Sequence, residues 1–151
     1  MSEGSDQTVT RLVQQALKKR FGEKAVPLAD VKDLYKQIFK SPEGETLRSL
    51  AQKTGGTLRA DLMITGTVWR YKERIGGAAG IERPASVAFI LFLIDVNNGK
   101  LLWTSTFDKT QRSLSEDFMD FRGLFKEGAR WLTAEELARH GVQEAFKKFP
   151  I

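Results

Sequence analysis

Residues 86–111 read SVAFILFLIDVNNGKLLWTSTFDKTQ, and this stretch decides the fold. Its first part carries apolar side chains at both alternating sets of positions, so a strand formed here is apolar on both sides and belongs at the centre of a sheet. Asn98-Gly99 fits the two positive φ angles of a tight hairpin turn. Apolar residues continue beyond the turn at Leu101, Trp103 and Phe107. The stretch therefore predicts an antiparallel hairpin in a sheet that is covered on both faces.

The residues before the hairpin predict a third strand. From residue 60 to residue 72 the side chains alternate with a period of two, as a strand requires. Gly66 interrupts one side of this pattern, which indicates a bulge or a close approach by another element. Residues 73–83 contain GGAAG and are typical of a mobile connection that ends at Pro84. Together the three strands form a predicted antiparallel meander.

Helical spacing of apolar residues precedes the meander. Amphipathic helices are predicted at residues 9–21, at residues 31–39 and, as a shorter helix, at residues 47–51. The apolar residues 25–28, between the first two helices, fit a short strand. These helices provide cover for one face of the sheet.

The residues after the meander are predicted to cover the other face of the sheet. Thr133 and Glu136 fit a capping box at the start of a final amphipathic helix. Further apolar residues available for the other face are Phe118, Phe121, Leu124, Phe125, Trp131 and Leu132. The predicted fold class is α/β (α+β), with a mixed sheet, a C-terminal antiparallel three-strand meander and helices covering both faces.

Length and composition limit the class of protein. The 151 residues predict a single globular domain over residues 8–151, preceded by a disordered tail at residues 1–7. No apolar run approaches the roughly 20 residues of a membrane-spanning helix. The absence of Cys excludes disulfides, thiolate metal sites and a thiol nucleophile. The formal net charge of +5 permits an acidic partner, but 24 basic against 19 acidic residues favour a solvated surface.

Three runs of the sequence are similar to a known group of proteins. They are ITGTVWRYKERIG at residues 64–76, RPASVAFILFLIDVNNGKLLWTSTFDKTQRSLSED at residues 83–117, and RWLTAEELARHGV at residues 130–142. They resemble a group of largely uncharacterised bacterial envelope lipoproteins. The globular domain of that group is similar to the TolB amino-terminal domain and to curli-secretion and penicillin-binding-protein-activator lipoproteins.

The resemblance implies a role and a location. It implies a non-catalytic accessory or scaffolding domain that contacts an envelope protein on the periplasmic side. Members of the group carry a signal peptide, a lipidated Cys and a strand ahead of the first helix, where this sequence has Met1-Ser2-Glu3-Gly4. We therefore expect a trimmed form of a longer chain, whose membrane attachment is through a lipid anchor alone.

The sequence offers little for catalysis. His140 is the only histidine, so no histidine pair or triad can form, and we expect it on a helix surface. Glu116, Asp117 and Asp120 would place carboxylates one helical turn apart, but a solvated helix entry explains them better. The GGAAG stretch lacks the Lys-Ser or Lys-Thr of a phosphate loop. We predict no catalytic residue, no cofactor-binding residue and no metal ligand.

Two surfaces are candidates for binding. Trp131 is the preferred anchor for a protein partner because large aromatic residues dominate interface energies, and Arg130, Gln111 and Ser113 are predicted beside it. The alternative is a small basic nucleic-acid-binding module, in which aromatic residues stack on bases and cations hold phosphates. Its residues would be Trp69, Arg70, Tyr71, Lys72 and Arg74. Packing of Trp69 and Tyr71 under a helix is the more ordinary interpretation, so nucleic acid is the weaker hypothesis.

Overall fold

The computed structural model describes residues 4–38, 46–77, 80–112 and 130–151. They divide into two compact units, each assembled from separate parts of the chain. Unit 1 comprises the described residues of Met1–Val13, Val68–Phe89 and Thr106–Phe149. Unit 2 comprises those of Gln14–Thr67, Ile90–Ser105 and Pro150–Ile151. The single globular domain predicted over residues 8–151 stays a prediction, and each unit is described by itself below.

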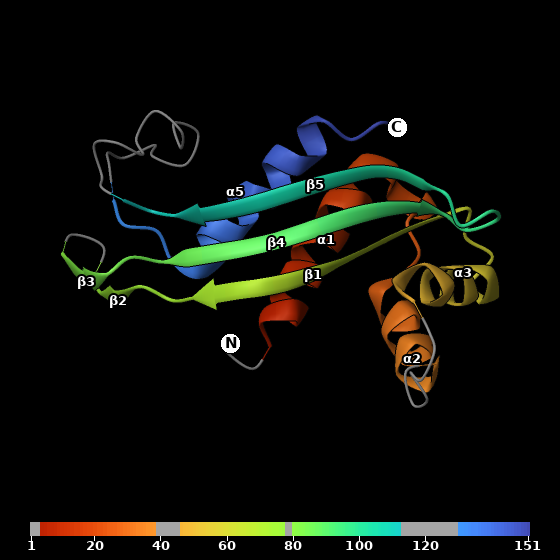
Figure 1. Cartoon of the computed structure of the whole chain (residues 1–151), viewed down its shortest axis with the longest axis horizontal. Coiled ribbons are helices and arrows are strands. Elements are labelled where there is room, and N and C mark those ends of the chain that lie inside the picture. Colours follow the sequence, from red (N-terminus) through yellow and green to blue (C-terminus); the bar gives the residue numbers. More distant parts are fainter. Residues whose placement is uncertain (1–3, 39–45, 78–79, 113–129) are drawn as a thin grey trace. The chain divides into compact units, whose positions relative to one another are not determined.

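The fold is α+β, as predicted (Figure 1). Its three-stranded sheet has the order β1-β4-β5 with antiparallel neighbours, which confirms the meander, and β2 and β3 form a small antiparallel pair. The helices are α1 (Ser5–Phe21), α2 (Leu28–Ile38), α3 (Leu47–Thr57) and α5 (Ala134–Lys147). The strands are β1 (Leu62–Lys72), β2 (Ile75–Gly76), β3 (Ile81–Arg83), β4 (Ser86–Asp95) and β5 (Leu101–Thr110).

Two local expectations differ from the structure at the start of the chain. Helix α1 begins at Ser5, inside the range predicted as a tail, and the Ser5 side chain is buried. The apolar residues 25–28 do not form a strand, because a 3₁₀ turn at Gly22–Lys24 leads through Pro27 directly into α2. Among the helices that the structure describes, α1, α2, α3 and α5, none is both long enough and apolar enough to cross a membrane.

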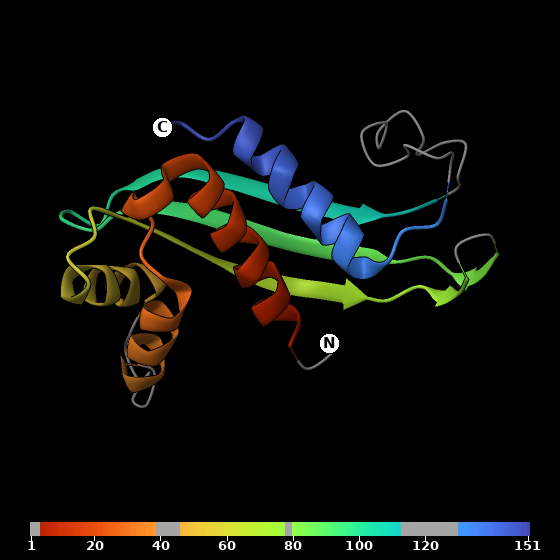
Figure 2. The ribbon, with the colours of Figure 1, turned by 180° about the vertical axis from the view of Figure 1, so that it is seen from behind.

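In unit 1, the beginning of α1 and helix α5 lie on the same face of the strands (Figure 2). The Phe107 ring of β5 contacts the rings of Phe89 and His140, at centroid distances of 5.4 and 6.4 Å. A Cβ added at Gly141 would lie 2.7 Å from the Phe107 ring, so only glycine permits this close approach of α5. Arg11 of α1 also pairs with Glu135 of α5 at 2.8 Å. His140 is therefore half-buried against Phe107 as well as lying on a helix surface.

The opposite face of the unit 1 strands carries a polar cluster. Arg70 donates to Ser86 Oγ at 2.5 Å and forms an ion pair with Asp108, and Ser86 Oγ lies 2.6 Å from Thr110 Oγ1. Four of the six residues predicted to cover this second face, Phe118, Phe121, Leu124 and Phe125, lie outside the described residues; of the other two, Leu132 is buried and Trp131 is half-buried. Cover on both faces therefore stays a prediction for this unit.

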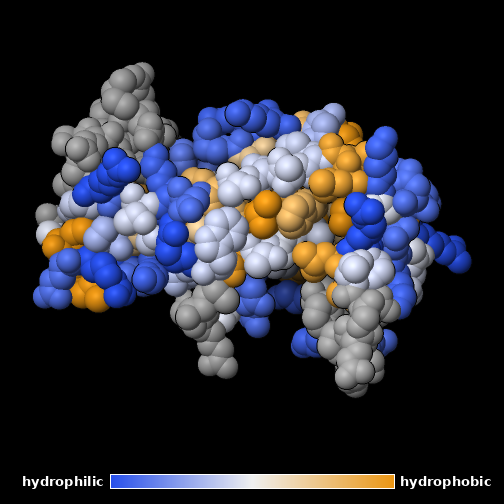
Figure 3. Space-filling view, viewed as in Figure 1, coloured by the Kyte–Doolittle hydropathy of each residue, from blue (hydrophilic) through white to orange (hydrophobic). Residues whose placement is uncertain are grey.

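In unit 2, α3 packs closely on the end of β4. A Cβ at Gly55 would lie 2.5 Å from Val96 Cγ2, and Gln52 donates to the Val96 carbonyl at 3.4 Å. The predicted close approach at Gly66 is confirmed, because a Cβ there would lie 2.2 Å from the carbonyl oxygen of Ile90. Hydrophobic residues gather on the surface over the unit 2 parts of β4 and β5 (Figure 3). Leu101 and Leu102, the first two residues of β5, are 44% and 42% exposed.

The β4–β5 turn is longer than predicted. Among the described residues only Arg59 and glycines have positive φ, so Asn98 does not, and Gly99 alone supplies that conformation with a φ of 71°. Asp95 organises the turn: its Oδ1 accepts from the amide of Asn97 at 2.9 Å, and its carbonyl accepts from the amide of Gly99 at 2.8 Å. A two-residue Asn98-Gly99 turn is therefore wrong, because a local side-chain hydrogen bond stabilises a wider loop.

Candidate functional site

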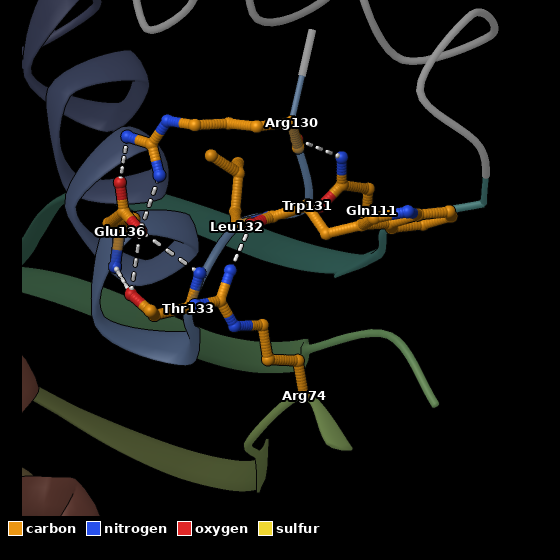
Figure 4. Close-up of polar contacts among 7 residues, drawn as sticks. All are labelled: Arg74, Gln111, Arg130, Trp131, Leu132, Thr133 and Glu136. Atoms are coloured by element: carbon orange, nitrogen blue, oxygen red, sulfur yellow. Dashed lines mark hydrogen bonds and ion pairs between the residues drawn. The ribbon is translucent and has the colours of Figure 1, made fainter. Parts of the chain in front are cut away.

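Gln111 fixes the extended segment that leads into α5 (Figure 4). Its side-chain nitrogen donates to the Arg130 carbonyl at 3.1 Å, and its side-chain oxygen accepts from the Leu132 amide at 2.8 Å. The side-chain carboxamide of Gln111 thus bonds the backbone of residues 130–132 in the way that the backbone of a neighbouring strand would. Gln111 is 0% exposed and both polar atoms of its side chain are bonded within the chain, so it holds residues 130–132 in place, whereas the sequence suggested a partner-binding residue at this position.

A second fixed point comes from the connection between β1 and β2. The guanidinium of Arg74 donates to the carbonyl oxygen of Trp131 (Figure 4). Arg74 and Trp131 are far apart in the sequence, and both belong to unit 1. The backbone of Trp131 is therefore held, while its side chain remains half-buried and partly accessible.

The third fixed point is an ion pair within the capping box of α5. Thr133 and Glu136 form the predicted capping box, with the Glu136 amide donating to Thr133 Oγ1 at 3.2 Å. Arg130 donates to Glu136 Oε1 at 2.9 Å and also bonds the second carboxylate oxygen. These Arg130 bonds, with further hydrogen bonds from Thr133, lower the pKa of Glu136 to about 2. Arg130 therefore serves the helix start and does not present an uncompensated charge.

This ion pair predicts a pH-dependent stability. Because the pKa of Glu136 is lowered from 4.5 to about 2 on folding, its stabilising effect is complete above the unfolded value and is lost as the pH falls toward 2. We expect Glu136→Gln, which retains an acceptor for the capping box, to lower the free energy of unfolding by about 1–2 kcal/mol at pH 7. Urea unfolding at pH 7 and pH 3 should show this difference shrinking by roughly half. A difference of the same size at both pH values would contradict this role for the carboxylate.

The remaining carboxylates at the start of α5 also have partners. Glu73 Oε1 accepts from the Ala134 amide at 2.8 Å and from the Arg74 amide at 2.9 Å. Glu135 bonds Arg11 at 2.8 Å and Arg139 at 3.1 Å, and the hydrogen bond from Arg11 is the main cause of its lowered pKa. The protein's own carboxylates thus occupy the positive end of this helix, where an external anion would otherwise bind.

The structure does not gather the residues of the nucleic-acid alternative on one surface. Arg70 lies in the polar cluster with Ser86 and Asp108, and Arg74 bonds the Trp131 carbonyl. Tyr71 is half-buried, and burial, followed by the nearby Glu73 and Glu135, raises its pKa. Trp69, 45% exposed, and the exposed Lys72 remain accessible. One exposed aromatic residue beside one lysine is a small part of a base-stacking surface.

Other predicted residues give no site. Ser113 and the carboxylates Glu116, Asp117 and Asp120 lie outside the described residues. In the part of the chain that the structure describes, no group of three or more His, Cys, Asp or Glu is placed to hold a metal ion. The sequence prediction missed Glu73 and the backbone role of Arg74, because each acts on a residue distant in the sequence. It also missed Ile75, a β2 residue that is 44% exposed next to Arg74.

Comparisons with known proteins identify no family for this chain. No protein-family model matches the chain, and no curated protein matches it significantly. A solved structure of a PelC dodecamer from Paraburkholderia phytofirmans is similar over 93% of this chain and 79% of that chain. The identity is 16% and the TM-score is 0.42. A likeness at this level carries no argument about function or assembly.

Proposed function

We propose that this protein is a non-catalytic accessory or scaffolding domain that binds a protein partner through Trp131. One observation carries the proposal: the segment around Trp131 is fixed on three sides, yet its indole is left partly accessible. Three residues hold the segment: Gln111 directly after β5, Arg74 in the connection between β1 and β2, and Glu136 in the first turn of α5.

Fixing the backbone favours binding. A partner that contacts a mobile loop must offset the entropy lost when the loop becomes ordered, whereas a segment already held by hydrogen bonds loses little. Tryptophan combines a large apolar area with few rotatable bonds and is enriched among the residues that dominate interface energies. The fixed Trp131 segment is therefore a suitable anchor.

The chemistry of the anchor region is apolar rather than ionic. Arg130 is neutralised by Glu136, and the charge of Arg74 is directed at a backbone carbonyl. Ile75, next to Arg74, adds an exposed apolar side chain. We expect the partner to present an apolar pocket for the indole, with hydrogen-bonding groups at its rim.

The envelope location is the second part of the proposal, and it depends on the sequence resemblance alone. The phrases PASVAF, LIDVNNGKLLW, FDKTQRSLSE and WLTAEELA, between residues 84 and 138, are those shared with the envelope lipoprotein group. The partner would then be another envelope protein on the periplasmic side, and the domain would be lipid-anchored in the full-length protein. Neither catalysis nor a cofactor is part of the proposal.

The binding role can be tested by crosslinking in cells. A photoreactive amino acid is placed at Trp131 in the full-length gene, expressed in its native cells. The matched control places it at Trp69, which is also in unit 1 and is 45% exposed but lies outside the fixed segment. We expect one discrete crosslinked protein from position 131 and none from position 69.

The crosslinked protein then provides a binding assay. With that protein purified, Trp131→Ala should weaken binding by about 30-fold or more, as for a dominant interface residue, while Trp69→Ala should change it less than about threefold. Equal crosslinking at both positions, or unchanged affinity for Trp131→Ala, would refute the role of Trp131. Fractionation of the same cells tests the location: an unacylated chain in the cytoplasmic fraction would contradict the envelope part alone.

A further inference from the structure

The end of α1, in unit 2, carries a short run of exposed cations. Lys18, Lys19 and Arg20 form its last turn, and Lys24 follows in the 3₁₀ turn. All four side chains are exposed, although Arg20 also donates from Nε to the Ile151 carbonyl at 2.7 Å. Glu23 is the single acidic residue within residues 18–24. The run is therefore a local concentration of positive charge.

Half-exposed apolar side chains follow the same run. Phe21, Val26 and Leu28 are each intermediate in exposure, and so are Val31 and Leu34 of α2. The connection is fixed rather than loose, because Gln14 of α1 donates to the Val26 carbonyl at 2.9 Å. Lysines and partly exposed apolar residues thus follow one another over residues 18–28, where the last turn of α1 continues into a connection that Gln14 ties back to the helix.

We propose that residues 18–28 form a docking surface for the anionic headgroups of a lipid bilayer. Lysines next to partly exposed apolar side chains are the composition of interfacial segments, in which cations meet headgroups while apolar groups enter the boundary below them. In α2 itself Asp30 and Asp33 offset Lys32 and Lys36, so the attraction is concentrated in residues 18–24.

The residue types favour lipid over the other anionic partners. Lysine is a compact, strongly hydrated charge that attracts phosphate-bearing headgroups without directional bonding, and the partly exposed apolar side chains beside it suit the boundary below the headgroups rather than a nucleic-acid backbone. Base stacking would also require several exposed aromatic side chains, and this stretch contains Phe21 alone.

The helix dipole explains only part of the run. Cations in the last turn of a helix interact favourably with its negative end, which accounts for residues 18–20. It accounts neither for Lys24, beyond the helix, nor for the apolar residues left half-exposed beside it. The inference is independent of the protein partner proposed for Trp131, since it concerns unit 2 and requires no other protein.

The test is vesicle co-sedimentation with the unmodified chain. We compare vesicles of pure phosphatidylcholine with vesicles containing one-third phosphatidylglycerol, at low and high salt. The wild-type chain should bind the anionic vesicles at low salt and dissociate from them at high salt, because salt screens the charges. Its affinity for the neutral vesicles should be at least about tenfold lower than its affinity for the anionic vesicles. Equal binding to both kinds of vesicle would overturn the proposal.

Two triple variants with the same loss of charge locate the surface. Lys18→Gln, Lys19→Gln and Lys24→Gln together should weaken binding to anionic vesicles by about 100-fold, at roughly fivefold for each lysine. The control changes three exposed lysines of unit 1, Lys72→Gln, Lys147→Gln and Lys148→Gln, and should weaken binding by less than about fivefold. Similar losses in both variants would show a net-charge effect and overturn the proposed surface. An oligonucleotide that binds more tightly than the vesicles, through the same lysines, would reassign the surface to nucleic acid.

Discussion

Gly66→Ala should lower the free energy of unfolding by about 3 kcal/mol or more. The added Cβ would lie 2.2 Å from the carbonyl oxygen of Ile90 and 3.2 Å from Leu91 Cδ2. The closer atom belongs to the backbone of the central strand β4, so it cannot rotate away as a side chain would. Relief therefore requires β1 to move away from β4, which strains the hydrogen bonds between the two strands. Chemical denaturation monitored by circular dichroism measures the loss.

Gly56→Ala is the matched control for this substitution. Gly56 is also in unit 2, and a Cβ there would meet nothing within 4 Å. It lies inside α3, where alanine is favoured over glycine, so we expect a gain of about 0.5–1 kcal/mol. If both variants changed stability in the same direction, the close approach at Gly66 would not be the cause.

Gln111→Leu should lower the free energy of unfolding by about 3 kcal/mol. Leucine is similar in size and apolar, but it leaves the Arg130 carbonyl and the Leu132 amide without the two bonds that Gln111 provides. Each polar group left unpaired in a buried place costs about 1–3 kcal/mol. Urea unfolding measures the loss, and amide hydrogen exchange should show the protection of Leu132 falling most.

The control for Gln111 is another glutamine that bonds a carbonyl. Gln52→Leu removes one longer contact of 3.4 Å with Val96, from a side chain that is only half-buried. It should cost less than about 1 kcal/mol because water can replace the lost bond. A Gln111→Leu variant as stable as Gln52→Leu would show that residues 130–132 do not depend on this side chain.

The parts of the fold that could be predicted depend on neighbours in sequence. The apolar run of β4 predicts a central strand because burial on both faces leaves no polar alternation, and the structure places β4 between β1 and β5. The Thr133 capping box was equally predictable, since both partners lie within one turn. The Asn98-Gly99 turn was not, because the Asp95 side chain competes with the two-residue geometry.

The candidate site was less predictable than the fold. Gln111 and Arg130 do lie near Trp131, but no local pattern indicates that Gln111 is buried, since glutamine is usually exposed. The bond between Glu73 and the Ala134 amide joins residues 61 positions apart. Such contacts have no signature in the sequence, and they become visible only when the strands and α5 are assembled.

The interleaving of the two units has a consequence for synthesis in the cell. Unit 2 has its strand segments once residue 105 has been made, whereas unit 1 needs α5, which ends at Lys147. At translation rates of about 5–20 residues per second, α5 follows roughly 2–8 seconds later. During that interval the Phe89–Phe107 pair lacks the helix that packs on Phe107. We therefore expect a nascent chain of this protein to leave the Phe89 and Phe107 rings without their helical cover until α5 has been made.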